Sequence, residues 1–259
     1  MQERTKLYFI SDIHLGIPPN EKEREQMFVA WLDYVKVDAK KIFLLGDIFD
    51  FWFSYKHVVP RGYVRVLGKL AELSDMGIEI HYAIGNHDMW IFDYFSKELD
   101  INTYSKPWGF TYDGKEFLVG HGDGLGKNDK KYNFLKLLFA SRICQKLFAS
   151  LHPYIGMSLA KFCSKRSRFS HSEMDLTYFG DDKEDITLYC KKALNDKHYD
   201  YCIFGHRHLL LDREIGQNTR YINLGQWVTD KYYAVYDNHD IKVESFLPIM
   251  NNEITALCF

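Results

Sequence analysis

The residues of this 259-residue chain that could do chemistry are Asp, Asn and His side chains in short clusters next to glycine. Each cluster follows an apolar run that is typical of a strand. The donor atoms are carboxylate and amide oxygens and imidazole nitrogens, without thiolates, and this set suits Mn, Fe or Zn ions. The clusters are Asp12-x-His14, Gly46-Asp47, Gly85-Asn86-His87-Asp88, Gly120-His121-Gly122-Asp123 and Gly205-His206-x-His208.

The number of these donors indicates two metal ions rather than one. Three oxygen donors and four histidines exceed what a single ion with an open coordination position uses. Two ions that share a bridging carboxylate would use all of them, as in many hydrolases that act on phosphoesters. A single Gly-Asp cluster is often only a turn, but five clusters of one format predict a metal site.

Such a site needs elements that bring the clusters together. In open α/β sheets, sites form beyond the carboxyl ends of the strands. Strand-like runs alternate with helical patterns in the first half of the chain, which predicts βαβ units and a largely parallel sheet. The strands are expected at 6–11, 42–45, 78–84, 117–119 and 201–204, and the helices at 21–36, 62–76 and 183–195. Four antiparallel strands are expected to follow, at 209–215, 219–223, 232–236 and 241–246, and Asn20 and Glu23 are spaced as a capping box for the first helix.

One segment differs from the rest in charge. Residues 127–174 contain ten basic and two acidic residues, a net charge of +8, whereas the whole chain has a net charge of −2. Within the segment, five apolar residues recur every four positions and predict one stripe along a helix. They are Leu135, Phe139, Ile143, Leu147 and Leu151. We therefore expect a single domain over residues 1–259 with a basic, amphipathic helical insertion at 127–174.

Composition excludes several classes of protein. Apolar residues make up 46% and charged residues 26%, a balance that excludes a disordered chain, and the near-neutral charge argues against a general nucleic-acid coat protein. The five cysteines form no CxxC pair and the N-terminus has no signal-peptide pattern, so we expect a cytoplasmic chain with reduced thiols. P-loop, GxSxG and GxGxxG motifs are absent from the sequence, which disfavours nucleotide-cofactor and serine-hydrolase functions.

The ordered series D-x-H, GD, GNHD, GH and GHxH, from residue 12 to residue 208, resembles the signature of the calcineurin-like metallophosphoesterase superfamily. The resemblance implies an α/β fold, a four-layer α/β/β/α sandwich. It also implies two divalent ions per chain, for which we expect Mn²⁺, with Fe or Zn as alternatives. The implied ligands are Asp12, His14, Asp47 and His208 for one ion and Asp47, Asn86, His121 and His206 for the other.

The same resemblance implies the roles of the remaining cluster residues. Asp47 would bridge the two ions, and a water between the ions would become acidic enough to attack phosphorus as hydroxide. His87 would act on the phosphoryl group as an acid or electrostatic stabiliser, and Asp88 would assist it. Asp123 would orient the metal ligands from behind.

Three motifs resemble one branch of the superfamily, the UDP-2,3-diacylglucosamine hydrolases. GDIFDFW at 46–52, HGDGLGKND at 121–129 and LGQW at 224–227 are similar to that family's GD-x-F-[DE]-x-W, HGDxLxxxD and LGxW. The resemblance implies cleavage of a pyrophosphate to UMP and 2,3-diacylglucosamine 1-phosphate, with the insertion as a lid over the acyl chains. The family carries GNRD where this chain has GNHD. The implied substrate contacts are Asn86, His87, Asp129, Ser164, Lys165, Arg168, His171 and His206.

The implied partners are a nucleotide-linked glycolipid and, through the insertion, the anionic cytoplasmic face of the inner membrane. Alternatively, the apolar stripe only docks the insertion on the body of the protein. Two further functions stay open, namely a phosphodiesterase for another nucleotide-linked lipid, a small nucleotide or nucleic acid, and a non-catalytic scaffold. Aliphatic stripes among the basic residues disfavour nucleic acid, and a scaffold would be expected to have lost metal ligands.

Overall fold

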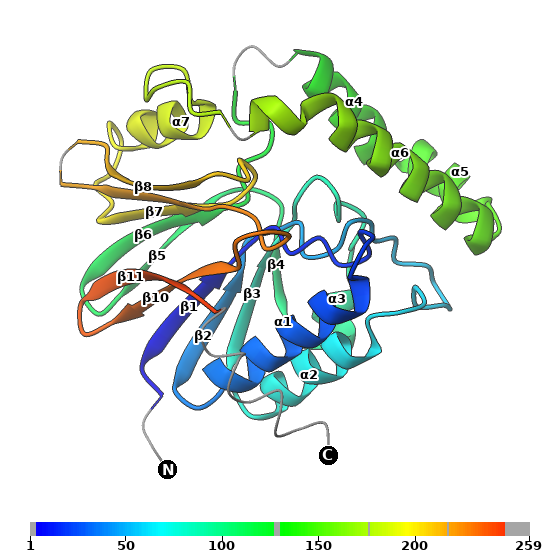
Figure 1. Ribbon diagram of the computed structural model, residues 1–259, viewed down its shortest axis with the longest axis horizontal. Helices are drawn as coiled ribbons and strands as arrows, with labels where there is room; N and C mark the ends of the chain where they lie inside the picture. The colour runs from blue at the N-terminus through cyan, green and yellow to red at the C-terminus, as the bar shows by residue number, and fades with distance from the viewer. Residues whose placement is uncertain (1–3, 127–129, 176, 217, 247–259) are drawn as a thin grey trace.

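The computed structural model describes residues 4–126, 130–175, 177–216 and 218–246. For residues 130–133 and 167–175 only the backbone is described. It contains two mixed sheets, with helices on their outer sides (Figure 1). The first has the strand order β11-β10-β1-β2-β3-β4 and the second β5-β6-β7-β9-β8. The strands are β1 (Lys6–Ile10), β2 (Ala39–Leu44), β3 (Glu79–Ala83), β4 (Asn102–Tyr104), β5 (Trp108–Tyr112), β6 (Lys115–Gly120), β7 (Tyr201–Phe204), β8 (Leu210–Glu214), β9 (Arg220–Leu224), β10 (Tyr232–Asp237) and β11 (Asp240–Ser245).

Helices form the two outer layers and a separate group at one end of the molecule. They are α1 (Glu21–Val35), α2 (Val64–Asp75), α3 (Tyr94–Glu98), α4 (Lys130–Ala140), α5 (Arg142–Ser150), α6 (Pro153–Asp175) and α7 (Asp185–Ala193). Trp31 of α1 and Leu70 of α2 pack on the first sheet, and Cys190 of α7 packs on the second. Stacked phenylalanines, among them Phe9 and Phe43, fill the space between the sheets. Three apolar cores thus separate four layers, which confirms the expected sandwich.

The sheet topology brings the candidate residues to one edge. β1, β2 and β3 lie side by side and parallel, as do β6 and β7 in the second sheet. Each of these five strands ends one to three residues before the first Asp, Asn or His of one of the five clusters. Because the carboxyl ends of parallel strands point the same way, the clusters meet at the end of the molecule where both sheets converge.

The last four strands correct one expectation. They form two hairpins, and the hairpins belong to different sheets: β8 and β9 to the second sheet, β10 and β11 to the first. The strands are antiparallel within each hairpin, as expected, but β9 also runs parallel to β7, so the four do not form one antiparallel run. The connection between the hairpins, Leu224 to Trp227, crosses from one sheet to the other and buries Trp227 against Trp31.

Two local predictions are also wrong. The capping box fails because Asn20 adopts a left-handed backbone conformation, φ 67°, and its side chain caps no N–H of α1. The apolar stripe of the insertion does not follow one helix, because Ser141 separates α4 from α5. Its extended backbone and its hydroxyl, which accepts a hydrogen bond from Cys144 N, start a new helix.

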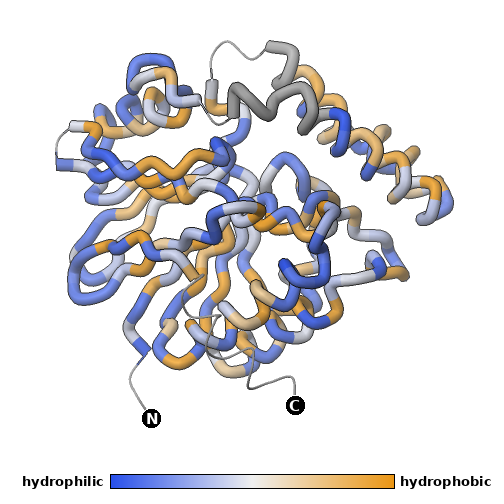
Figure 2. Tube along the Cα trace, in the orientation of Figure 1, coloured by the Kyte–Doolittle hydropathy of each residue, from blue (hydrophilic) through white to orange (hydrophobic). Residues whose placement is uncertain are grey.

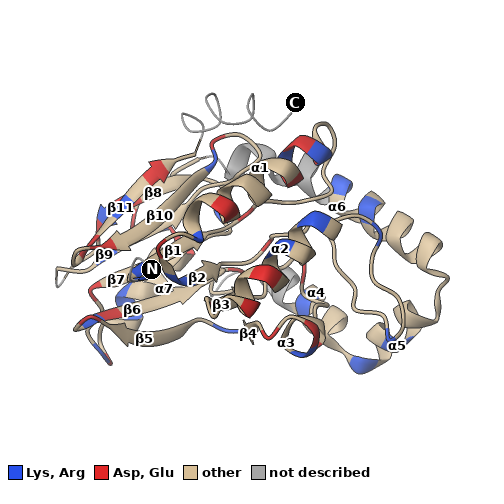
Figure 3. Cartoon of the chain, turned by 90° about the horizontal axis from the view of Figure 1, so that it is seen from below, with Lys and Arg blue, Asp and Glu red and all other residues tan. Residues whose placement is uncertain are grey.

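The α4–α6 segment (residues 130–175) carries both apolar and basic residues on its surface. Figure 2 shows hydrophobic residues along α5 and the described part of α6, and Figure 3 shows Lys and Arg on the same helices. Leu137, Ile143 and Leu147 are among the exposed apolar side chains. Among the described residues, no helix combines the length and apolarity that crossing a bilayer requires.

Candidate metal centre

The first group of donors lies beyond β1 and β7 and consists of Asp12, His14 and His208. The Nε2 atoms of His14 and His208 are 3.1 Å apart. Asp12 Oδ1 lies 3.2 Å from His208 Nε2 and 3.7 Å from His14 Nε2. One donor atom from each residue therefore faces a common point, and all three lie within 4.8 Å of one another.

The second group lies beyond β2, β6 and β7 and consists of Asp47, His121 and His206. Asp47 Oδ2 and Asn86 Oδ1 each lie 3.2 Å from His121 Nε2. His121 is held from behind, because its Nδ1 lies 2.8 Å from the carbonyl oxygen of Leu45. The structure thus brings together all seven residues that the sequence proposed as ligands, in two neighbouring groups. Asp47 lies in the second group.

The donors of the first group fit a divalent cation. Asp12 Oδ1 and His14 Nδ1 are buried and make no hydrogen bond within the described part of the chain. Burying unpaired polar atoms costs free energy, and a cation on the Asp12 side would supply the missing partner for the carboxylate. Burial acts to raise the pKa of Asp12, but the imidazoles of His14 and His208 hold it well below its usual range, so the carboxylate stays charged.

The backbone at these ligands is strained. Five of the seven have a positive φ although none is glycine, a conformation that costs roughly 1–2 kcal/mol for such residues. Strain of this kind gathers at functional sites, because there a side chain has to point in one direction. The five are Asp12 (φ 52°), His14 (φ 50°), Asp47 (φ 51°), His206 (φ 71°) and His208 (φ 49°).

The glycines that precede the ligands allow two loops to approach each other closely. A Cβ on Gly85 would collide with the Asp47 carboxylate, and a Cβ on Gly205 would collide with Ser11 Oγ and Asp12 Oδ2. Ser11 Oγ in turn donates to the Leu45 carbonyl oxygen at 2.8 Å, so a shift of Ser11 away from the added Cβ would break this hydrogen bond. Glycine therefore precedes these ligands because a side chain at its position would collide with the neighbouring loop.

Asp88 and Asp123 lie behind the two groups of donors. Asp88 is buried and accepts hydrogen bonds from Ile48 N at 2.9 Å and Gly85 N at 2.8 Å, so it ties together the loops after β2 and β3. Burial and the charge of Asp47 raise its pKa to about 6. Asp123 Oδ2 accepts from Lys136 Nζ of α4 at 2.5 Å. These contacts suit an orienting role for both carboxylates.

His206, a donor of the second group, and His87, which lies beside the first group, have pKa shifts of opposite sign. Burial and the neighbouring His121 lower the pKa of His206 to about 4, so its imidazole is neutral and able to bind a metal. Burial acts to lower the pKa of His87, but the charges of Asp47 and Asp50 raise it to about 9. The shift favours the protonated imidazole, which is the form that can donate a proton.

Asp50 is a residue of the site that the sequence reasoning missed. It is buried, with Oδ1 3.4 Å from His87 Nδ1 and 3.9 Å from His14 Nδ1. The available signal was its place in GDIFD, three residues after Asp47, although no glycine or histidine stands next to it.

The α4–α6 segment supplies the remaining residues that the sequence proposed. Ser164 of α6 donates to Asp50 Oδ1 at 2.8 Å and lies 3.4 Å from His87 Nδ1, whereas Lys165 is exposed. The side chains of Arg168 and His171 lie outside the described residues, as does the whole of Asp129.

Aromatic side chains dock the α4–α6 segment on the body of the protein. Phe148 packs against Phe51, Phe53 and Trp90. Trp90 Nε1 donates to the carbonyl oxygen of Phe139 at 2.9 Å. Docking thus accounts for part of the apolar character of the segment, but it leaves the exposed apolar residues of α4, α5 and α6 unused.

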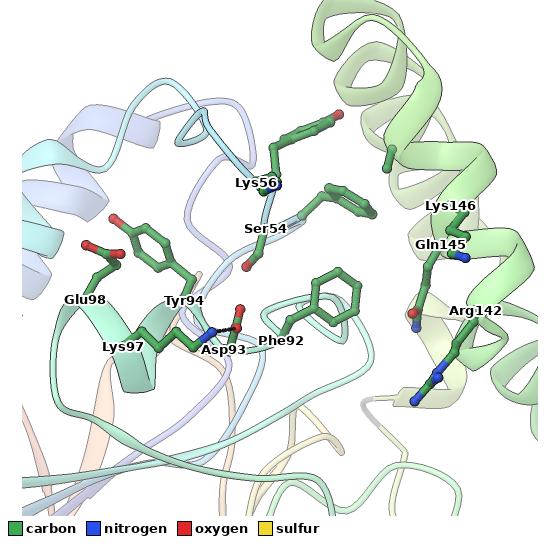
Figure 4. Close-up of a pocket in the computed structure, with 13 residues that line it drawn as sticks. Ser54, Lys56, Phe92, Asp93, Tyr94, Lys97, Glu98, Arg142, Gln145 and Lys146 are labelled. Atoms are coloured by element: carbon green, nitrogen blue, oxygen red, sulfur yellow. Dashed lines mark ion pairs between the residues drawn. The ribbon is translucent and has the colours of Figure 1, made fainter.

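A cavity of about 590 Å³ lies between α5, the loop that follows β2, and α3 with the residues just before it. Its floor includes Phe53, Phe92 and Tyr94, and Figure 4 shows Arg142, Gln145 and Lys146 of α5 on the opposite side. None of the proposed metal ligands lines it.

Comparisons with known proteins agree with this geometry. The sequence profile of the calcineurin-like phosphoesterase family matches residues 5–210. UDP-2,3-diacylglucosamine hydrolase from Porphyromonas gingivalis is 37% identical over 256 residues, which cover 93% of this chain and 98% of the relative. The enzyme of the same name from Tolumonas auensis is 27% identical over 250 residues, which cover 93% and 96%.

Solved structures that align with this chain have more distant sequences. A phosphoesterase from E. coli aligns over 93% of this chain and 93% of its own, with a TM-score of 0.46 and 15% identity. The family is established by the sequence comparisons, because the matched profile spans most of the chain and all seven proposed ligands. This chain belongs to the calcineurin-like phosphoesterase family, and it is a metal-dependent hydrolase.

Proposed function

We propose that this chain hydrolyses the pyrophosphate of UDP-2,3-diacylglucosamine. A water oxygen bonds to one phosphorus while the bridging P–O bond breaks, and the products are UMP and 2,3-diacylglucosamine 1-phosphate. The observation that carries the proposal is the 37% identity to a hydrolase of that name along nearly the whole of both chains. The two groups of donors beside a basic, apolar helical segment support it, because a nucleotide-linked lipid has a charged part and an apolar part.

The proposed site residues divide into three roles. Two divalent ions, for which we propose Mn²⁺, would neutralise phosphoryl charge and acidify a water when bound. Asp12, His14 and His208 would hold one, and Asn86, His121 and His206 the other, with Asp47 between them. His87, whose ring centroid is 4.8 Å from that of His14, would donate a hydrogen bond to a phosphoryl oxygen or a proton to the leaving phosphate.

The α4–α6 segment would hold the lipid part of the substrate. Basic residues at the rim of the cavity beside α5, such as Arg142 and Lys146, lie near the aromatic floor formed by Phe53 and Phe92. An acyl chain would bury apolar surface there, while Ser164 and Lys165 of α6 would face the phosphates. Asp129, Arg168 and His171 are proposed as further contacts.

The assay that tests this function is hydrolysis of UDP-2,3-diacylglucosamine with added Mn²⁺, with UMP as the measured product. We expect UMP release, because the phosphate monoester that departs when the bridging P–O bond breaks is a good leaving group. Bis-p-nitrophenyl phosphate serves in parallel as a diester that needs no lipid site. Cleavage of this diester without UMP release would leave the hydrolase chemistry in place and rule out the lipid substrate. It would favour the alternative of a smaller nucleotide substrate.

We also propose that the exposed apolar residues of the α4–α6 segment bind the anionic cytoplasmic face of the inner membrane, where such a lipid resides. Ile143 and Leu147 lie one turn apart on α5, as do the basic residues Arg142 and Lys146. An amphipathic helix of this kind inserts its apolar side chains and pairs its charges with lipid phosphates.

The double variant Ile143→Glu/Leu147→Glu tests this surface by co-sedimentation with phosphatidylglycerol vesicles. Each apolar side chain contributes on the order of 1.5 kcal/mol when buried, so vesicle binding should fall about tenfold or more. Val64→Glu, a change at an equally exposed apolar residue of α2, is the matched control and should bind normally. Equal binding of all three proteins would contradict membrane contact through α5.

A further inference from the structure

Arg207 stands in the chain between two proposed metal ligands, His206 and His208, and its side chain forms an ion pair with Glu184. Its Nε and Nη2 atoms donate to the two carboxylate oxygens of Glu184, at 2.9 and 3.2 Å. The Arg207 side chain is 17% exposed and that of Glu184 is 4% exposed. A bidentate, charge-assisted pair of this kind is stronger than a neutral hydrogen bond, and it fixes the orientation of both side chains.

The same two side chains hold the connector (residues 177–184), which lies between α6 and α7 (Figure 1). Arg207 Nη2 also donates to the carbonyl oxygen of Thr177 at 2.7 Å, and Glu184 Oε1 accepts a hydrogen bond from Phe179 N at 3.1 Å. Thr177 lies two residues after the end of α6. Arg207 therefore joins the loop that carries two ligands to the place where the α4–α6 segment returns to the body of the protein.

The ligand loop needs such support because its backbone is strained. His206 and His208 have φ angles of 71° and 49°. Strained conformations persist only where the surrounding structure determines them through several contacts. Asp12 Oδ2 accepts a hydrogen bond from His206 N at 2.9 Å and is one such contact. The pair between Arg207 and Glu184 is a second contact, and it comes from the start of α7 rather than from a metal ligand.

We propose that Arg207 is a positioning residue for His206 and His208, and that its contacts make metal binding and the placement of the connector depend on each other. Coupling between two sites is reciprocal. If the connector strengthens Mn²⁺ binding through Arg207, bound Mn²⁺ must also hold the connector more firmly. The proposal rests on the proposed metal centre but not on the lipid substrate. It goes beyond the proposed ligands and substrate contacts, since neither Arg207 nor Glu184 belongs to them.

The first test measures Mn²⁺ binding to the full chain by titration calorimetry. Arg207→Ala should raise the apparent Kd for Mn²⁺ by about 10–100-fold, the usual loss when a group that orients metal ligands is removed. Arg207→Lys keeps the charge but not the bidentate geometry, so it should recover only part of the affinity.

Arg213→Ala is the matched control for this titration. Arg213 also contacts the connector, because its Nε lies 3.7 Å from Asp181 Oδ1 and its guanidinium carbon lies 4.6 Å from the centroid of the Tyr178 ring. No proposed ligand precedes or follows Arg213 in the chain. Arg213→Ala should therefore bind Mn²⁺ as the wild-type chain does, and a loss as large as that of Arg207→Ala would overturn the positioning role.

A double variant separates positioning from folding, because Arg207→Ala leaves the buried Glu184 carboxylate without its ionic partner. Replacement of a buried ion pair by apolar side chains is often nearly neutral for stability. Arg207→Met/Glu184→Leu should therefore unfold within a few degrees of the wild-type chain and still bind Mn²⁺ about tenfold more weakly. Unchanged Mn²⁺ affinity in this folded double variant would overturn the proposal.

The second test measures amide hydrogen exchange in residues 177–184 with and without Mn²⁺. In the wild-type chain, Mn²⁺ should slow exchange there, including exchange of the Phe179 N–H that donates to Glu184. In Arg207→Ala, a concentration of Mn²⁺ that saturates the variant should not slow it. Slowing of equal size in both proteins would overturn the coupling.

The two tests need no substrate, so their outcome is separate from that of the proposed function. Absence of UMP release in the wild-type chain, together with the expected Mn²⁺ binding and exchange, would reject the lipid substrate and keep this proposal. UMP release in the wild-type chain with an unchanged Kd in Arg207→Ala would reject this proposal and keep the substrate.

Discussion

Asp47→Ala is expected to abolish hydrolysis and metal loading together. The carboxylate is buried, with Oδ2 3.2 Å from His121 Nε2, and its Oδ1 accepts a hydrogen bond from His87 N at 2.8 Å. The carboxylate therefore supplies a metal ligand and a negative charge, and it also holds the loop that follows β3. Removal of one essential active-site carboxylate costs on the order of 10⁴-fold in rate in other hydrolases, and we expect a loss of that size here.

The measurement pairs the rate on bis-p-nitrophenyl phosphate with the Mn²⁺ content of the purified protein. Asp182→Ala serves as the control, because the Asp182 side chain is 96% exposed and pairs only weakly with Lys191 at 3.4 Å. It should leave rate and metal content unchanged. Full activity in Asp47→Ala would contradict a two-ion centre in which Asp47 is the shared ligand.

Gly205→Ala is expected to damage the site without removing any functional group. Its added methyl group would collide with Ser11 Oγ and Asp12 Oδ2, both of which are buried. Overpacking of this kind costs about 1–3 kcal/mol, and in a chain of this size the Tm should fall by several degrees. Because Asp12 has to shift, the rate on the artificial diester should also fall at least about tenfold.

Gly68→Ala provides the comparison, since Gly68 lies in α2 with no neighbouring atom within 4 Å of the added methyl group. There the change should raise the free energy of unfolding by about 0.5–1 kcal/mol, because alanine is the better helix former. Thermal unfolding and rate are measured on both variants. A Gly205→Ala protein as stable and active as the Gly68→Ala protein would contradict the close approach of the two loops.

The sequence predicts the elements that precede the site well. The signal at each of β1, β2, β3, β6 and β7 is local, namely an apolar run followed by glycine and a polar donor. β7 falls at its expected residues, and the other strands shift by a few residues at their ends. All seven proposed ligands come together because parallel neighbours place their carboxyl ends at one edge.

What the sequence does not predict depends on contacts between distant segments. The division of the last four strands between two sheets depends on the buried Trp227 crossing, which no local pattern reveals. The short β4 and β5 depend on pairing with β3 and β6. Asp50 is part of the site through its contacts with His87 and Ser164, which lie 37 and 114 residues away in the chain, and neither Asp50 nor Ser164 stands in a Gly-plus-ligand cluster.

The left-handed backbone at five of the proposed ligands affects which substitutions at these positions would stabilise the fold. Glycine adopts a positive φ without cost, so each of these positions would gain on the order of 1 kcal/mol if glycine replaced the ligand. A descendant that no longer needed metal would drift toward glycine or asparagine there, since most mutations accumulate in whatever direction stability allows. This chain keeps Asp or His at all five. At these five positions stability is given up so that each side chain points in one direction, which disfavours the scaffold alternative.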